Sequence, residues 1–160
     1  MPLEQFKPVV AAPVVIGTPV RMLASYVVLQ NHLPMMADYP SAYRANPLTP
    51  VVAGIPATWD DSRALIARVG EEIVIARRSG KVWWIGAMTD RHARGVRFPL
   101  TFLPAGTFRA DIYRDDLGAE SRYKLETREV RASGELSLPL AAAGGALVRL
   151  TPISETPRSP

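Results

Sequence analysis

The first third of the chain contains an apolar segment that begins with a clear helix start. Thr18 can accept hydrogen bonds from the free amides of a first turn. Pro19 suits the first helical position, because an amide there would have no partner within the helix and proline has no amide hydrogen. Residues 20–30 are then apolar on almost every side of a helix, whereas a helix on a domain surface keeps a polar face. We therefore predict a helix that is buried all round and whose packing partner lies outside this chain.

Proline divides the rest of this third into short pieces. The chain has 15 prolines in 160 residues, and they interrupt helices because proline lacks the amide donor. Residues 41–46 predict a brief helical turn, and Thr49 and Pro50 repeat the pattern of a cap followed by proline before a short helix over residues 51–54. We expect one long helix and one or two short ones before residue 65.

From about residue 68 the apolar residues alternate with polar ones, which is typical of strands with one buried face. Ser79 and Gly80 predict a tight hairpin turn, since glycine tolerates positive φ. Pro99 has no ladder donor, so we place its strand at a sheet edge. The fold class we predict is mainly β: a small antiparallel β-sandwich of about seven strands, at residues 72–78, 82–89, 96–102, 108–113, 122–130, 135–140 and 146–150.

Composition excludes several classes of function. A net charge of +4 could suggest nucleic acid, but the cations are spread along the chain and interleaved with acids, so we expect no nucleic-acid partner. The absence of cysteine excludes disulfides, thiol catalysis and cysteine metal sites. No apolar run approaches the ~20 residues of a membrane span, and no signal peptide is evident, so we expect no membrane partner and leave the localisation open.

The ionisable residues show no catalytic pattern. His32 and His92 each lie in an expected loop or bend without other metal ligands at a matching spacing, and no serine lies in a nucleophile elbow. Adjacent carboxylates on a strand point to opposite faces, so they rarely share a site. Asp60 and Asp61 could order a loop by accepting hydrogen bonds from backbone amides. The pairs at residues 71–72 and 115–116 are typical of solvated strand ends. The carboxylates considered are Asp60 and Asp61, Glu71 and Glu72, Asp115 and Asp116, and the single residues Asp38 and Asp90.

The aromatic residues offer a different hypothesis, because tryptophan can stack on sugars through its flat apolar face. Trp83 and Trp84 are neighbours on one strand, so one of them is expected in the core and the other partly exposed or beneath a neighbouring domain. Core or interface packing is the favoured interpretation, and sugar stacking is the alternative. The candidates are Trp59, Trp83 and Trp84, with Tyr113 and Tyr123 beside them.

The order of several short motifs resembles the carboxyl-terminal part of family 97 glycoside hydrolases, from about Phe6 to Pro152. No single motif is specific, but their order is. The motifs are residues 23–28 (LASYVV), 33–40 (LPMMADYP) with Tyr43, 55–63 (IPATWDDSR), 69–73 (VGEEI), 76–78 (ARR), 83–86 (WWIG), Thr89 with Asp90, and 108–115 (FRADIYRD).

The resemblance implies enzymes with an amino-terminal β-sandwich, a central (β/α)8 barrel that holds calcium and the catalytic acids, and a small carboxyl-terminal β-sandwich. Such enzymes act on α-glucosidic or α-galactosidic bonds and are usually periplasmic or secreted. Their catalytic and calcium-binding carboxylates lie upstream of the matched stretch. We therefore assign no catalytic, cofactor-binding or metal-binding residue to this chain, and calcium is implied only for the parent enzyme.

These expectations divide the chain into a helical segment resembling the end of a barrel (residues 1–64), a β-sandwich domain (65–152) and a disordered tail (153–160). The predicted function is that of a non-catalytic carboxyl-terminal domain for packing or oligomerisation, a fragment whose partner is the missing barrel. Self-association through the long helix, with Met22, Tyr26 and Val27 as the interface, is a further hypothesis. The alternative is a carbohydrate-binding module that uses exposed tryptophans.

Overall fold

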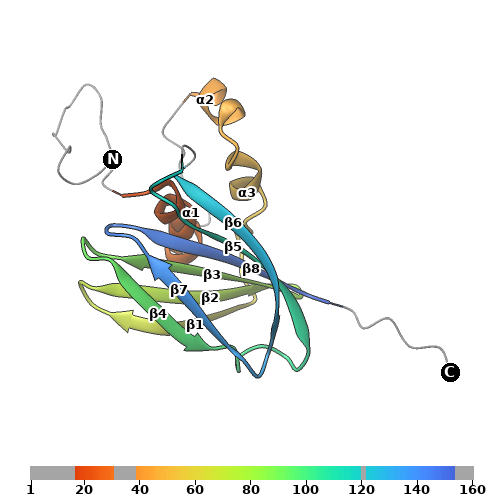
Figure 1. Ribbon diagram of the computed structural model, residues 1–160. Coiled ribbons are helices and arrows are strands. Elements are labelled where there is room, and N and C mark those ends of the chain that lie inside the picture. Colours follow the sequence, from red (N-terminus) through yellow and green to blue (C-terminus); the bar gives the residue numbers. More distant parts are fainter. Residues whose placement is uncertain (1–16, 31–38, 120–121, 154–160) are drawn as a thin grey trace.

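The structure is a computed structural model that describes residues 17–30, 39–119 and 122–153 (Figure 1). Within these residues three short helices precede eight strands. The helices are α1 (Pro19–Val28), α2 (Pro40–Ala45) and α3 (Thr49–Ala53). The strands are β1 (Asp61–Arg68), β2 (Glu72–Ser79), β3 (Val82–Thr89), β4 (Arg94–Pro99), β5 (Thr107–Asp115), β6 (Tyr123–Arg131), β7 (Glu135–Leu140) and β8 (Gly145–Pro152).

Two antiparallel sheets form the β part of the molecule. Six strands lie in the order β1-β2-β3-β8-β5-β6, and β4 pairs with β7 in a second, smaller sheet. Pro99 therefore lies on a strand with one neighbour, as predicted. The mainly β fold with antiparallel sheets and a few short helices is confirmed.

The main core lies between the two sheets, because alternate residues of each strand point to the facing sheet. β7 shows this pattern clearly, with Leu136, Leu138 and Leu140 buried and their neighbours exposed. The fully buried side chains include Ile85, Ile112 and Leu150 from the large sheet and Phe98 from the small one.

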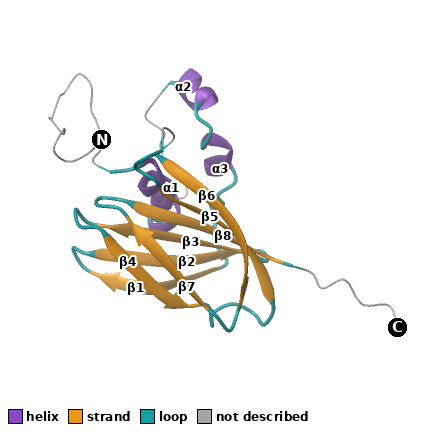
Figure 2. Ribbon diagram, viewed as in Figure 1, coloured by secondary structure: helices purple, strands orange, loops and turns teal. Residues whose placement is uncertain are grey.

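Helix α1 packs against the other face of the six-stranded sheet, where β3 and β8 lie at its centre (Figure 2). Its partner is therefore in this chain, and the prediction of a helix buried all round by an absent partner is wrong. The large sheet is apolar on both faces, so the helix has a surface to cover. The outward side of α1 stays accessible at Met22 (45% exposed), and its buried residues are Val20, Leu23, Ala24, Val27 and Val28.

Two glycines let α1 approach the sheet closely. A Cβ atom at Gly86 of β3 would lie 2.7 Å from the carbonyl oxygen of Ala24 and 3.0 Å from Val27 Cβ. A Cβ atom at Gly145 of β8 would lie 2.8 Å from Arg21 Cα. Real Cβ atoms do not approach backbone atoms so closely, so any larger residue at either position would push the helix away from the sheet.

Both ends of α1 are held by polar contacts. Thr18 Oγ1 accepts a hydrogen bond from the Arg21 amide at 3.1 Å, which confirms the predicted cap. At the other end, buried Arg77 of β2 donates from Nε to the Val27 carbonyl at 2.6 Å and from Nη2 to the Val28 carbonyl at 3.3 Å. Carbonyls in the last turn of a helix lack intrahelical donors. The guanidinium group of Arg77 provides two of these missing donors.

The alternation of apolar and polar residues did not predict strand β1. This strand brings the number of strands in the described residues to eight instead of the expected seven. β1 pairs with β2, but its register shifts between Ala64 and Ile66, and this bulge interrupts the period of two. The sheet thus begins at Asp61, a few residues before the expected start of the sandwich. Of the expected tail, residues 154–160 lie outside the described part of the chain.

Two local details also differ from expectation. Ser79 pairs with Val82, so the hairpin turn consists of Gly80, whose φ is 58°, and the residue after it. Thr49 does not cap α3; it is the first residue of that helix, and its hydroxyl donates to the Tyr43 carbonyl at 2.6 Å.

We predict that Gly86→Ala will destabilise the protein, because the new methyl group must displace either the α1 backbone or the strand. Strain of this kind costs about 1–3 kcal/mol in a packed interior. Gly95→Ala is the matched control, since a Cβ there meets no atom within 4 Å. Urea unfolding followed by tryptophan fluorescence measures both, and equal stability of the two variants would contradict the close seat of α1.

We predict that Arg77→Gln will also destabilise the protein, because two carbonyls at the end of α1 lose buried donors. The expected loss is about 1–3 kcal/mol. Arg78→Gln serves as the control: Arg78 is a neighbouring arginine whose ion pair with Asp60 is long, at 3.4 Å, and partly exposed. A loss for Arg77→Gln no larger than for the control, measured by urea unfolding, would show that Arg77 does not hold the helix.

Candidate functional site

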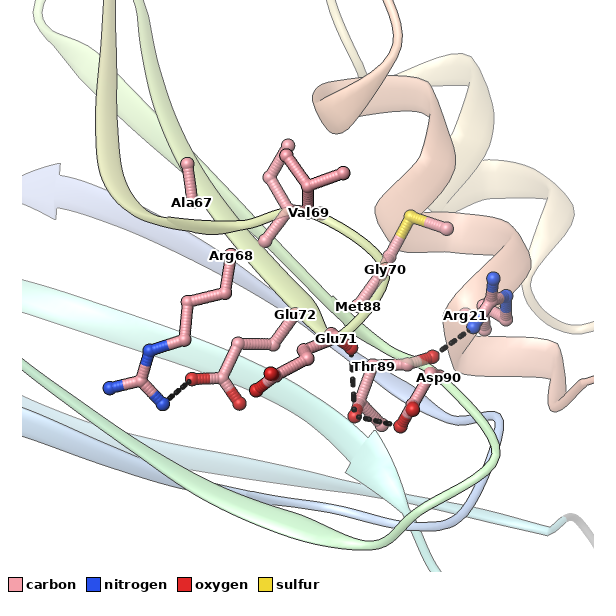
Figure 3. A pocket seen from close by; sticks show the side chains of 11 residues that line it. Arg21, Ala67, Arg68, Val69, Gly70, Glu71, Glu72, Met88, Thr89 and Asp90 are labelled. Atoms are coloured by element: carbon pink, nitrogen blue, oxygen red, sulfur yellow. Dashed lines mark hydrogen bonds and ion pairs between the residues drawn. The ribbon is translucent and has the colours of Figure 1, made fainter.

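A cavity of about 400 Å³ lies beside the start of α1, between the β1–β2 turn and the end of β3 (Figure 3). Its lining combines apolar side chains with charged side chains of both signs. Arg21 reaches from α1 to the carbonyl of Thr89, which ties the helix to this end of the sheet. The lining residues are Arg21, Ala67, Arg68, Val69, Gly70, Glu71, Glu72, Ile73, Met88, Thr89 and Asp90.

Arginines hold the acidic groups near this cavity. Arg94 at the start of β4 approaches Glu71 at 3.4 Å, Glu72 at 3.5 Å and Asp90 at 3.2 Å. Arg68 contacts Glu72 at 2.9 Å. The side chain of Glu72 is only 6% exposed, so the expectation of a solvated strand end is wrong for this residue, although Glu71 is exposed. The cluster joins the β1–β2 turn to the start of the small sheet.

Asp90 is the most strongly perturbed carboxylate of the group. The amide of His92 donates to its Oδ1 at 2.9 Å, and the His92 ring lies 2.9 Å from Oδ2. These contacts, with help from Arg94, hold the pKa of Asp90 well below its usual value. A carboxyl group that is held ionised cannot donate a proton near neutral pH, so this arrangement supports a structural role. His32 and Asp38 lie outside the described residues.

Three of the other four paired carboxylates bind backbone amides, whereas Asp61 contacts the Arg63 side chain at 3.1 Å. Asp60 Oδ2 accepts from the amide of Gly80 at 2.7 Å, so this residue does order a loop as expected. Asp115 Oδ2 accepts from the amide of Gly145 at 2.9 Å, and burial raises the pKa of this carboxyl group. Asp115 is therefore not a solvated strand end. Asp116 accepts from the amide of Gly118 at 3.3 Å within its own turn.

The described residues offer no place that fits calcium, the metal that the resemblance implies for whole enzymes. Within them, no group of three or more histidine, cysteine, aspartate or glutamate side chains is arranged to hold a metal ion. No step in the function proposed below therefore involves the metal. The helices in this part of the chain are also too short or too polar to cross a membrane.

Trp83 and Trp84 are both buried, on opposite faces of β3. Trp83 is 2% exposed and lies in the main core, where its ring meets Phe102 edge to face with centroids 5.0 Å apart. Trp84 is 4% exposed and packs with Leu23 and Leu147 on the helical side. One indole is therefore in the core and the other lies beneath a helix of the same chain, so neither offers a free face for a sugar.

Trp59 is more accessible than the other two tryptophans. It is partly buried and packs against the small cluster around Trp84, as do Tyr113 and Tyr123. Burial raises the pKa of the Tyr113 hydroxyl, which is consistent with packing. Sugar stacking stays a prediction, and in this structure it depends on Trp59.

The three residues expected at an interface lie on different sides of α1. Val27 is fully buried against the sheet, Tyr26 is half-buried, and Met22 points outward. Leu29, just after the helix, is 61% exposed. An interface on this helix would therefore use its outward side, around Met22 and Leu29, and would leave Val27 in place.

Sequence reasoning missed the arginines that organise the fold. Arg77 is a charged residue in the otherwise apolar pattern of β2, at a position that faces α1. This interruption was the one feature of the sequence that could have indicated a buried arginine. The acidic partners of Arg94 lie 4 to 23 residues away along the chain, so no short sequence motif predicts these ion pairs.

A family model described as "Glycosyl-hydrolase 97 C-terminal, oligomerisation" matches residues 58–151, more than half of the chain. A retaining α-galactosidase of Bacteroides thetaiotaomicron is 36% identical over 149 residues, which is 91% of this chain and 22% of the relative. A probable retaining α-galactosidase of Streptomyces bingchenggensis is 36% identical over 120 residues, 74% of this chain and 18% of the relative. The chain spans about a fifth of the length of these curated relatives.

Solved structures also point to family 97 glycoside hydrolases. A family 97 glycoside hydrolase from Pseudoalteromonas sp. strain K8, in complex with panose, superimposes with a TM-score of 0.78 at 38% identity. The match covers 86% of this chain and 23% of that enzyme. The chain belongs to the glycosyl-hydrolase 97 C-terminal family.

Proposed function

We propose that this chain is the non-catalytic carboxyl-terminal association domain of a family 97 type glycoside hydrolase. It would pack against the catalytic barrel of that enzyme and hold copies of the enzyme together. Hydrolysis would be carried out in the barrel. The names of the relatives favour an α-galactosidic bond as the parent substrate, and the panose complex keeps an α-glucosidic bond as the second possibility.

The observation that carries the proposal is the position of the helices before residue 58. The family model begins at residue 58, but the alignment with the Bacteroides enzyme covers 91% of the chain and so includes most of the helical segment. That segment therefore has counterparts in whole enzymes, outside the association domain as the family defines it. We assign it to the junction between this domain and the barrel.

The accessible surface of the helices supports this assignment. α2 and α3 have no buried residue, and α2 stands away from the strands (Figure 2). Met22 and Leu29 expose apolar side chains on the side of α1 that faces away from the sheet, and Tyr39 before α2 is 78% exposed. These exposed apolar side chains are available to a contact with another domain.

The carboxylates of the described residues argue against catalysis in this chain. Glycoside hydrolysis needs a proton donor and a second carboxylate that is free to attack or to activate water. Glu72, Asp90 and Asp115 are instead held by arginines or backbone amides.

We expect the purified chain to show no turnover of aryl α-galactosides or aryl α-glucosides, with or without added calcium. The measurement is release of the aryl group over hours at micromolar protein. The Bacteroides α-galactosidase under the same conditions is the positive control. Turnover that co-purifies with the chain and saturates with substrate would contradict the proposal.

We also expect no saturable change in tryptophan fluorescence when α-glucan oligosaccharides are added, because two of the three indoles are buried. Trp59→Phe is the matched variant, since it removes the most accessible indole and keeps an aromatic ring. A saturable response in the original chain that Trp59→Phe abolishes would favour the carbohydrate-binding alternative.

A further inference from the structure

The edge strands of the two sheets differ in how they are protected against pairing with another chain. An edge strand has backbone donors and acceptors without ladder partners, and proteins usually guard such edges with charges or proline. β4 contains Pro99 and β7 contains Pro139. At the far edge of the large sheet, β6 has a charge at five of its nine positions: Lys124, Glu126, Arg128, Glu129 and Arg131.

Strand β1 is charged at Asp61, Arg63 and Arg68 and contains a bulge, which also guards an edge, but the centre of the strand has neither charge nor proline. It pairs with β2 on one side only, and residues 64–67 contain neither a charge nor a proline. Ala64 and Ala67 are exposed, while Leu65 and Ile66 are partly buried against the core. The centre of this edge is thus apolar, and its small residues let another backbone come close.

The bulge in β1 places Asp61 and Arg68 at equal ladder distances from Ala64, whereas the position that matches Arg63 is occupied by the uncharged Ile66. Along β2, the partners of Asp61, Ala64 and Arg68 are Arg78, Ile75 and Glu72, which are spaced three residues apart. Counted along β2, Asp61 lies three ladder positions before Ala64 and Arg68 lies three positions after it. Leu65 is not counted, because it lies in the bulge and has no partner on β2. Because Asp61 and Arg68 are separated by six positions, both side chains point to the same face of the sheet.

A two-fold axis through Ala64 would set this strand against itself. In an antiparallel pair each Ala64 would face Ala64 of the second copy, and Ser62 would face Ala67. Asp61 of each copy would face Arg68 of the other, so two pairs of opposite charges would form at the ends. The Arg68 side chain is 65% exposed and is held at the strand end by Glu72.

We infer that two copies of this chain associate through the β1 edge, in an antiparallel pairing centred on Ala64 that joins the two large sheets into one. The inference rests on the self-association in the proposed function and identifies the surface that carries it. The charge pairs select this register, because a shift of the strands removes Asp61 from Arg68. On the helical side, the pairing places Ala64 and Ala67 of both copies beside the half-buried Ile73 and Ile75.

A single engineered cysteine tests the register, because the chain has no cysteine of its own. With Ala64→Cys, the two sulfur-bearing residues would face each other at the ~4.5–5.5 Å Cα separation of an antiparallel pair, which is within disulfide range. We expect mild oxidation of the full chain to give a covalent dimer on a non-reducing gel. Leu125→Cys, an exposed position on β6, is the control and should stay monomeric.

Analytical ultracentrifugation separates the possible outcomes. We expect the original chain to sediment at twice 17.5 kDa, Ala64→Lys at half the mass of the original, and Leu125→Lys at the mass of the original. Ala64 is exposed, so the fold itself should tolerate Ala64→Lys, and the variant should have the thermal midpoint of the original chain when both are measured at a dilution at which the original is monomeric. A dimer that survives Ala64→Lys, with no cross-link in Ala64→Cys, overturns the β1 pairing alone. A chain that is monomeric at every concentration overturns self-association as well.

Discussion

The close contact between α1 and the six-stranded sheet is the constraint on which the rest of the structure depends. Gly86 and Gly145 remove the side chains that would keep the helix backbone away, and Arg77 satisfies the carbonyls at its end. With α1 in place, the sheet is covered on both faces, by the helix on one and by β4 and β7 on the other. Three layers result from a chain in which most of the residues after α3 form strands.

Local patterns in the sequence were sufficient to predict most of the fold. The Thr18 cap, the β2–β3 hairpin and the edge position of Pro99 each follow from the chemistry of one or two residues. β1 could not be predicted from alternation, because its bulge interrupts the period. The orientation of α1 could not be predicted either: Met22 and Leu29 are as apolar as the buried Leu23, so hydropathy does not distinguish the inner side of the helix from the outer. Gly86 lies within a strand and Gly145 at the start of another, and the sequence does not show that either contacts a helix.

The charged residues were the least predictable part. Glu72 and Asp115 lie in acidic pairs that are typical of solvated strand ends, yet distant arginines and a distant amide bring them into the structure. Such partners depend on tertiary contacts, which a single sequence does not display. These contacts give both carboxylates a structural role.

Hydrogen–deuterium exchange on the full chain, read by mass spectrometry, tests most directly whether α1 is an integral part of this fold. Amides in a buried, capped helix open only with the surrounding structure. The account predicts that residues 23–28 exchange as slowly as the central strand β3 and much more slowly than α2. Exchange of residues 23–28 at the rate of α2, while β3 stays protected, would show that the helix is only loosely attached to the sheet and would contradict the account.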